Sequence, residues 1–185
     1  IVRMLPDNTI VGVADDDMFY YPGWLDAHLE VMSTYPDVGT VSGWPVRTQF
    51  RFHNKSTLEW GKRYANGFER GKFISPQEDK DFCTSIGRDY MGYQIHYTRN
   101  DYDIKLTYKG VETYATGHHA QWMGISGVIR QFVSYDREAM ANERPFEKAV
   151  DDAGLLRLTT YKRYTRHIGN MLDEDLEDLW QEIRS

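Results

Sequence analysis

The chain has 185 residues, of which 41% are hydrophobic, so it carries enough apolar material for one ordinary core. Its formal charge of −6 argues against a nucleic-acid surface built on phosphate neutralisation, and we expect no nucleic-acid partner. From Met171 onward there are six acidic residues and one Arg, so this tail carries most of the negative charge and the body is nearly neutral.

Cysteine content and hydropathy indicate in which cellular compartment the protein is expected. Cys83 is the single cysteine, so it forms no internal disulfide and cannot alone build a thiolate zinc site. This usage fits a reducing compartment, and we expect a cytoplasmic protein. No apolar run reaches the ~20 residues that span a bilayer, and the amino end lacks the plan of a signal peptide, so no transmembrane segment is expected. The chain opens on Ile1, close to a strongly patterned segment, and this start indicates an excerpt.

The first elements predict an α/β unit. Residues 10–14 form a short apolar run typical of a strand buried on both faces, and the run stops at three consecutive Asp residues, 15–17. Pro22 and Gly23 mark a turn before a helix over 24–35, and residues 38–43 predict a second strand. Ligands are therefore expected at the carboxyl edge of a sheet.

The remaining elements are less regular. Ser56 and Glu59 form a capping-box pattern that predicts a helix through Arg70. Residues 73–102 receive no assignment. The later segments predict a hairpin over 105–115 that turns at Lys109 and Gly110, and a strand or a helix over 121–132. A helix is predicted over 148–158, followed by an extended segment over 160–168. The last predicted element is a helix over 172–183 with one apolar stripe, formed by Leu172, Leu176, Leu179 and Ile183. No linker or repeat is visible, so residues 1–185 form a single domain.

The three acidic residues are the strongest chemical signal. Adjacent carboxylates at the end of a buried strand repel one another, and burial adds a desolvation penalty. A divalent cation relieves both penalties, and Mg²⁺ or Mn²⁺ accepts one or two carboxylates alongside phosphate oxygens. In extended backbone Asp15 and Asp17 point to one side and Asp16 to the other. The alternative interpretation is a solvated acidic loop or a helix N-cap cluster, because Asp favours both.

These motifs resemble a known family. Residues 11–17, 22–25 and 38–43 are together similar to the central signature of family 2 glycosyltransferases of the A-type fold, and residues 150–157 and 167–170 follow in the family's order. The resemblance implies a partial Rossmann-like fold with a mixed central sheet flanked by helices. It implies that residues 1–50 end the donor- and metal-binding half, that 51–170 form the acceptor half, and that 171–185 form an acidic C-terminal helix. Most of the half that holds the nucleotide base has no counterpart, so we expect an N-terminally truncated domain.

The resemblance also implies roles for single residues. Asp15 and Asp17 would hold Mn²⁺ or Mg²⁺ on the diphosphate of a nucleotide-sugar donor, and Asp16 would face the donor sugar or ribose. His167 would complete the metal shell, against a plain loop or packing role. The donor is expected to be a UDP-sugar in preference to other nucleotide sugars, and the acceptor a carbohydrate or another hydroxyl compound.

A carboxylate opposite the donor would act as general base for an inverting transfer. Asp152 is the candidate for this role and Asp151 the second choice. Both acids also suit helix capping without any catalytic role.

Four further side chains are candidates for acceptor contact. His118 and His119 follow a probable strand and point opposite ways, so at most one of them faces the site, and a structural role is the alternative for both. Trp122 offers a broad apolar ring to a sugar face, but core packing fits it equally well. Trp44 is open to the same two interpretations.

Two other function classes compete with a glycosyltransferase. The first is a Mg²⁺-dependent phosphoryl hydrolase or transferase that uses the same acidic strand end, although no matching Lys or Gly-rich phosphate loop is present. The second is a non-catalytic carbohydrate-binding or interaction fragment of a transferase, in which aromatic residues and the acidic tail bind the partner.

Overall fold

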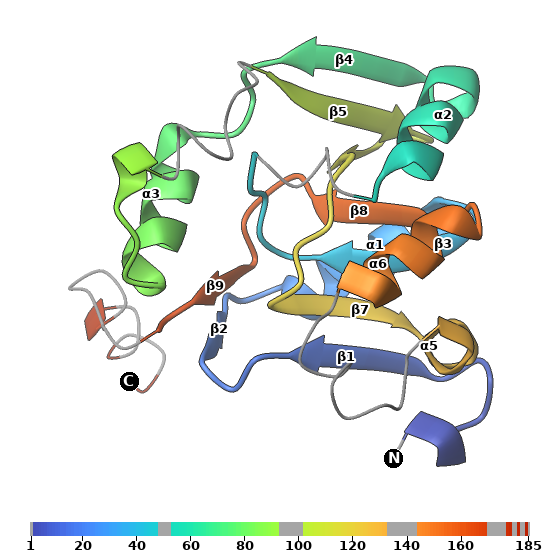
Figure 1. Cartoon of the computed structure of the whole chain (residues 1–185), viewed down its shortest axis with the longest axis horizontal. Helices are drawn as coiled ribbons and strands as arrows, with labels where there is room; N and C mark the ends of the chain where they lie inside the picture. Colours follow the sequence, from blue (N-terminus) through green and yellow to red (C-terminus); the bar gives the residue numbers. More distant parts are fainter. Residues whose placement is uncertain are drawn as a thin grey trace.

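The protein is an α/β structure with a mixed central sheet flanked by helices (Figure 1). The computed structural model describes residues 2–47, 53–92, 102–132 and 144–169, together with positions 177, 178, 181 and 184. Within these residues none of the helices is both long and apolar enough to cross a bilayer.

The central sheet has seven strands. Their order across the sheet is β1 (Ile10–Ala14), β7 (Gln121–Ile125), β3 (Val38–Ser42), β8 (Leu156–Thr160), β6 (Val111–Tyr114), β5 (Asp103–Tyr108) and β4 (Gly67–Gly71). Only β3 and β8 pair in parallel, and every other pair is antiparallel. A separate two-stranded ladder joins β2 (Met18–Tyr20) to β9 (Thr165–His167).

The helices cover both faces of the sheet. Those whose bounds are described include a short 3₁₀ turn η1 (Val2–Met4), α1 (Trp24–Thr34), α2 (Lys55–Tyr64), α3 (Pro76–Ser85), α5 (Ser126–Phe132) and α6 (Arg144–Asp152). In Figure 1, α1 lies behind the sheet and α6 in front of it. The main core lies where α1 meets the central strands, and its buried members include Val31, Tyr35, Val41, Leu106, Leu156 and Leu158.

Strand directions decide where the candidate site lies. Strand β7 is antiparallel to both β1 and β3, and β3 is parallel to β8, so β1, β3 and β8 all run the same way. Their last residues, Ala14, Ser42 and Thr160, therefore lie at one edge of the sheet, which we call the carboxyl edge. The β2–β9 ladder lies beside this edge (Figure 1).

Several predicted elements are confirmed. The strand over 10–14, the helix after Gly23 and the strand over 38–43 are present as β1, α1 and β3. The hairpin turns at Lys109 and Gly110, which have φ values of 48° and 86°. A positive φ is one that glycine adopts without strain, so the sequence signal for this turn had a clear physical basis. The ambiguous segment over 121–132 contains both a strand, β7, and a helix, α5.

The expected burial of the first strand is wrong. Residues of β1 alternate between exposed and half-buried positions, because successive side chains point to opposite faces of the sheet and neither face is fully covered here. Strand β1 is also an edge strand that pairs only with β7 among the described residues. The apolar run over 10–14 therefore belongs to a partly exposed strand and not to a strand that is buried on both faces.

Two predicted helix boundaries are also wrong. Helix α2 stops at Tyr64, and β4 occupies 67–71, where the helix was expected to continue. The capping box does not form: the N-cap residue is Asn54, and the Asp151 carboxylate accepts hydrogen bonds from the amides of Lys55 and Ser56. A carboxylate that is remote in sequence has replaced the local cap.

Helix α6 also differs from the expectation, and α3 lies in a stretch for which no element was predicted. Helix α6 ends at Asp152, and β8 follows, so the acidic pair lies at the end of a helix and not at its start. Helix α3 falls in the unassigned stretch, although Ser75 caps it and Pro76 opens it. Of the predicted C-terminal helix, the described positions 177, 178, 181 and 184 are helical, and its apolar stripe lies outside the described residues.

Candidate functional site

The acidic residues after β1 are held at the carboxyl edge by backbone hydrogen bonds. The amide of Asp15 donates to the carbonyl of Ala120 (2.8 Å), just before β7. The carbonyl of Asp17 accepts from the amide of Ile168 (2.8 Å), just after β9. In the β2–β9 ladder Met18 lies opposite His167. The turn after β1 is therefore fixed between two segments that are distant in sequence.

This pairing brings three potential metal ligands together. Asp15, Asp17 and His167 each offer one ligand atom, and the three atoms lie within 4.8 Å of one another. Nε2 of His167 is 3.2 Å from Oδ2 of Asp17. The side chain of His167 is 14% exposed and that of Asp17 is 35% exposed, while Asp15 is exposed. A cation here would have two carboxylate oxygens and one imidazole nitrogen on the protein side and solvent on the other.

The donor set suits a divalent cation of intermediate softness. Carboxylate and imidazole together are ligands that Mn²⁺ accepts, and Mg²⁺ takes the carboxylates alone. Ligation through Nε2 requires the tautomer with its proton on Nδ1. Nδ1 is buried and has no hydrogen-bond partner among the described residues, so no contact there opposes this tautomer.

Close packing at Gly43 positions the strand that carries His167. The carbonyl of Gly43 accepts from the amides of Tyr164 (2.7 Å) and Thr165 (3.2 Å). A Cβ at position 43 would lie 2.8 Å from the Thr165 side chain and 2.9 Å from that of His28, so only glycine fits without displacement. The amide of Gly43 donates to Oε1 of Gln121 (2.8 Å), and this ties β3, β7 and β9 into one buried network.

The two adjacent histidines differ in their surroundings. His118 is buried, and Nδ1 accepts a hydrogen bond from the amide of Ala120 (3.1 Å), so the proton resides on Nε2. Burial holds the pKa of His118 well below its usual value, and the neighbouring His119 adds to this effect. The rings of His118 and Trp44 stack at 5.9 Å. His118 is thus a packed, neutral side chain.

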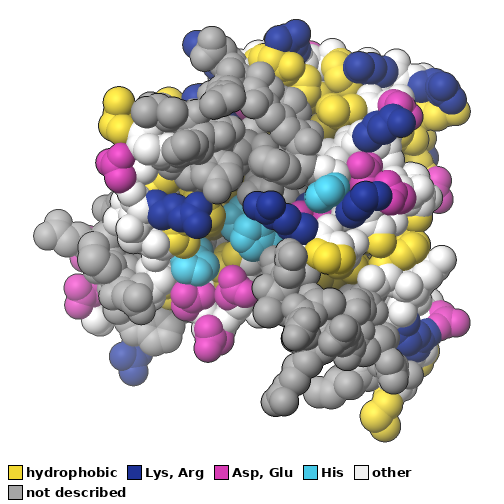
Figure 2. Space-filling view, viewed as in Figure 1, with side chains coloured by type: hydrophobic (Ala, Val, Ile, Leu, Met, Phe, Trp, Pro, Cys, Tyr) yellow, Lys and Arg dark blue, Asp and Glu magenta, His cyan; other side chains and the backbone are white. Residues whose placement is uncertain are grey.

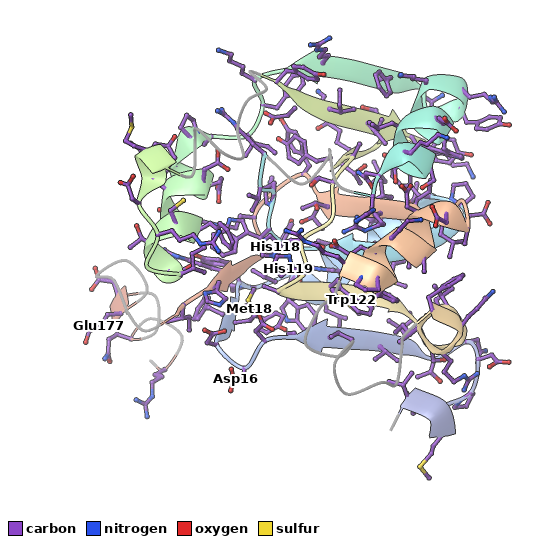
Figure 3. The ribbon with its side chains drawn as sticks, in the orientation of Figure 1. Asp16, Met18, His118, His119, Trp122 and Glu177 are labelled. Atoms are coloured by element: carbon purple, nitrogen blue, oxygen red, sulfur yellow. The ribbon has the colours of Figure 1, made fainter. Side chains whose placement is uncertain are left out.

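His119 is the member of the pair that reaches the surface. Its ring stacks on that of His118 at 4.9 Å, and the residue is exposed (Figure 3). Desolvation lowers the pKa of His119, and the Asp15 carboxylate opposes this shift. The expectation that the two side chains point opposite ways is wrong, because their rings stack face to face on the same side of the chain; they differ in burial, and only His119 is exposed.

A buried ion pair supports the segment before β7, and sequence analysis missed it. Arg157 on β8 pairs with Glu147 on α6, and both side chains are almost fully buried. Arg157 also donates to the carbonyls of Gly117 (3.3 Å) and His53 (2.9 Å). The only signal in the sequence is a single Arg between leucines, at Leu156, Arg157 and Leu158.

The two tryptophans that were candidates for acceptor contact are buried, and Asp16 points away from the histidines. Trp122 is 7% exposed and stacks on Phe146 at 4.9 Å, and Trp44 is 1% exposed and donates from Nε1 to Glu78 (3.0 Å). Both indoles are core residues, so neither presents a ring to a sugar. Asp16 is exposed and projects away from the histidines (Figure 3), and nothing in the structure tests its expected contact with a donor.

The predicted catalytic acids lie at the wrong edge of the sheet. Asp151 and Asp152 precede β8, and the amide of Leu156 donates to the carbonyl of Asp37 (2.8 Å) just before β3. Because β3 and β8 start there and run toward the carboxyl edge, both acids lie at the opposite edge from Asp15 and Asp17. Asp151 caps α2, and Asp152 pairs with Lys148 on the surface. The assignment of either as general base at the metal cluster is wrong.

The face that carries the cluster has a mixed charge. Figure 2 shows histidine side chains at its centre, with acidic side chains on one side and Lys and Arg side chains on the other.

Comparison of the chain with protein-family models, curated proteins and solved structures finds no match. The likeness to family 2 glycosyltransferases therefore rests on the motifs alone.

Proposed function

We propose that the protein is a metal-dependent glycosyltransferase of the A-type class. It would transfer a sugar from a nucleotide-diphosphate-sugar donor to an acceptor hydroxyl, and Asp15, Asp17 and His167 would hold the Mn²⁺ or Mg²⁺ ion. One observation carries the proposal: three side chains that the motifs singled out, one of them on a distant segment, offer ligand atoms within 4.8 Å of one another.

The position of the cluster supports this reading. Ligands of α/β sheets bind outside the carboxyl ends of strands, and the cluster lies at the carboxyl edge. In glycosyl transfer negative charge builds on the departing diphosphate, and a bound divalent cation would stabilise it as a Lewis acid. Asp15 and Asp17 would orient that cation, and His119 lies beside Asp15 on the face open to solvent.

The test is a titration of the chain with Mn²⁺, followed by assays with UDP-glucose, UDP-N-acetylglucosamine and GDP-mannose. We expect Mn²⁺ binding that is lost when Asp15→Ala and Asp17→Ala are combined, and nucleotide-sugar turnover that EDTA abolishes. The control for Mn²⁺ affinity is Asp26→Ala, which removes an exposed carboxylate from the first turn of α1.

Three results would contradict the proposal. Turnover that is unaffected by EDTA would exclude the metal role. Mn²⁺ binding that survives the double substitution would place the ion elsewhere. Hydrolysis of nucleotides without sugar release would favour the phosphoryl hydrolase interpretation.

A further inference from the structure

A concave surface lies at the edge of the sheet opposite the metal cluster, between α2 and the turn that joins α6 to β8. We call it the α2–α6 groove. It has a volume of about 410 Å³ and is lined chiefly by Glu59, Trp60, Arg63, Tyr64, Asp152 and Gly154. Small-molecule sites typically have volumes of about 300–1,000 Å³, so the groove has room for a ligand of that size. Asp151 on α6 accepts hydrogen bonds from the first amides of α2 and so holds the two walls of the groove together.

One wall of the groove is aromatic. Trp60 and Tyr64 lie one helical turn apart on α2, and their ring centroids are 6.2 Å apart. Trp60 is anchored by Tyr108, whose ring is 5.1 Å away, whereas Tyr64 is 56% exposed. Large apolar rings that remain in solvent on a concave surface indicate a contact site for a ligand with an apolar face.

The charged groups around these rings already have partners within the protein. Lys55 pairs with Glu59 at 3.8 Å, and Lys148 pairs with Asp152. The Arg63 guanidinium lies 5.8 Å from the centre of the Tyr64 ring. Because Glu59 and Asp152 are each paired with a lysine, a cationic ligand would have to compete with those lysines, while a neutral ligand with several hydroxyls can hydrogen-bond to the same groups without displacing them.

We propose that the α2–α6 groove binds one sugar ring of a neutral oligosaccharide, stacked on Tyr64 with its hydroxyls hydrogen-bonded to Glu59, Arg63 and Asp152. A pyranose combines an apolar C–H face with a rim of hydroxyls, and this matches an aromatic wall bordered by paired charged groups. A Cβ at Gly154 would meet no atom within 4 Å, so the space beside this lining residue is open to such a ring. The groove and the metal cluster lie at opposite edges, so binding needs no divalent ion.

The experiment uses the full chain in EDTA with maltotetraose, cellotetraose, mannotetraose and tetraacetyl-chitotetraose as probes. Calorimetry measures affinity, and NMR follows the indole N–H signal of Trp60. We expect at least one probe to bind and to shift that signal. Tyr64→Ala should weaken binding at least about tenfold, which corresponds to ~1.4 kcal/mol. Tyr64 is 56% exposed, so its replacement by Ala should leave the fold intact, and circular dichroism of the variant checks this.

The matched control is Tyr161→Ala, which removes another exposed tyrosine, 40% accessible, just after β8 at the carboxyl edge. This variant should bind as tightly as the wild type. The proposal is overturned when no probe binds, when Tyr64→Ala binds like the wild type, or when Asp15→Ala with Asp17→Ala abolishes binding. Because the assay excludes divalent ions, its outcome is separate from that of the proposed transferase activity.

Discussion

Buried charged side chains in this protein are arranged in small clusters. Arg157 and Glu147 form one pair beneath the segment before β7. Arg47 lies between two buried carboxylates, with Nε 3.8 Å from an oxygen of Asp79 and 3.8 Å from one of Asp103. Removing one partner of a buried pair leaves an uncompensated charge, so these residues hold the helices α6 and α3 against the sheet.

The two carboxylates around Arg47 are not equally satisfied. Oδ2 of Asp103 accepts from the amides of Phe73 (2.9 Å) and Ile74 (2.8 Å). Oδ1 of Asp79 accepts one longer bond, from the amide of Arg47 (3.3 Å), and in each carboxylate the other oxygen has no hydrogen-bond partner among the described residues. Burial raises the pKa of Asp79 from 3.8 to about 6, while the contacts with Arg47 oppose this shift.

We predict that Asp79 makes stability depend on pH. The folded state holds the proton more tightly than the unfolded state, so the wild type loses stability as the pH rises from about 4 to 6, by up to ~3 kcal/mol. Asp79→Asn keeps a neutral side chain at every pH and should lack this loss. Urea denaturation of both proteins at pH 4, 5, 6 and 7 measures the difference. Parallel pH profiles would show that Asp79 is not protonated in the folded protein.

At the scale of single elements, the short strand β9 decides whether the candidate site exists. It carries His167, and it pairs with β2 directly after the acidic turn. Its approach depends on Gly43, where a side chain would strike Thr165 and His28. A glycine at the end of β3 therefore controls a histidine on another strand.

We predict that Gly43→Ala displaces β9. Overpacking of this kind costs about 1–3 kcal/mol of stability. The Mn²⁺ affinity should fall about 10- to 100-fold, as it does when groups that orient metal ligands are altered. Mn²⁺ titration and urea denaturation measure the two effects. The control is Gly12→Ala on β1, where a Cβ meets nothing within 4 Å. Equal Mn²⁺ affinity in the two variants would show that β9 does not depend on Gly43.

On the scale of the whole molecule, the cluster joins the first strands of the chain to its last described strand. Asp15 and Asp17 follow β1, and His167 ends β9. These segments meet only in the folded state, so the unfolded chain does not present the three ligands together.

We predict that Mn²⁺ stabilises the fold as a whole. A ligand that binds only the folded state at 100 times its Kd adds about 2.7 kcal/mol to the free energy of unfolding. Thermal and urea unfolding with and without Mn²⁺ should show this increase in the wild type. The Asp15→Ala and Asp17→Ala double variant serves as the control and should show none. A gain of the same size in the double variant would mean that the stabilising ion binds elsewhere.

Local patterns were enough to predict the elements whose signals are local. The run over 10–14, the Pro22–Gly23 turn with its helix, and the Lys109–Gly110 hairpin all depend on the conformational preferences of adjacent residues. The acidic turn was located for the same reason. The likeness to a glycosyltransferase signature selects Asp15, Asp17 and His167 as candidate ligands from the sequence alone.

Only the tertiary structure decided which of these residues meet. The pattern did not reveal that β1 is an edge strand, that Asp151 caps α2, or that Trp122 and Trp44 are core residues. It placed Asp152 beside the acidic turn, whereas the direction of β8 places it at the opposite edge. Strand order and direction arise from contacts between segments far apart in the chain, and a one-dimensional pattern carries no distance between such segments.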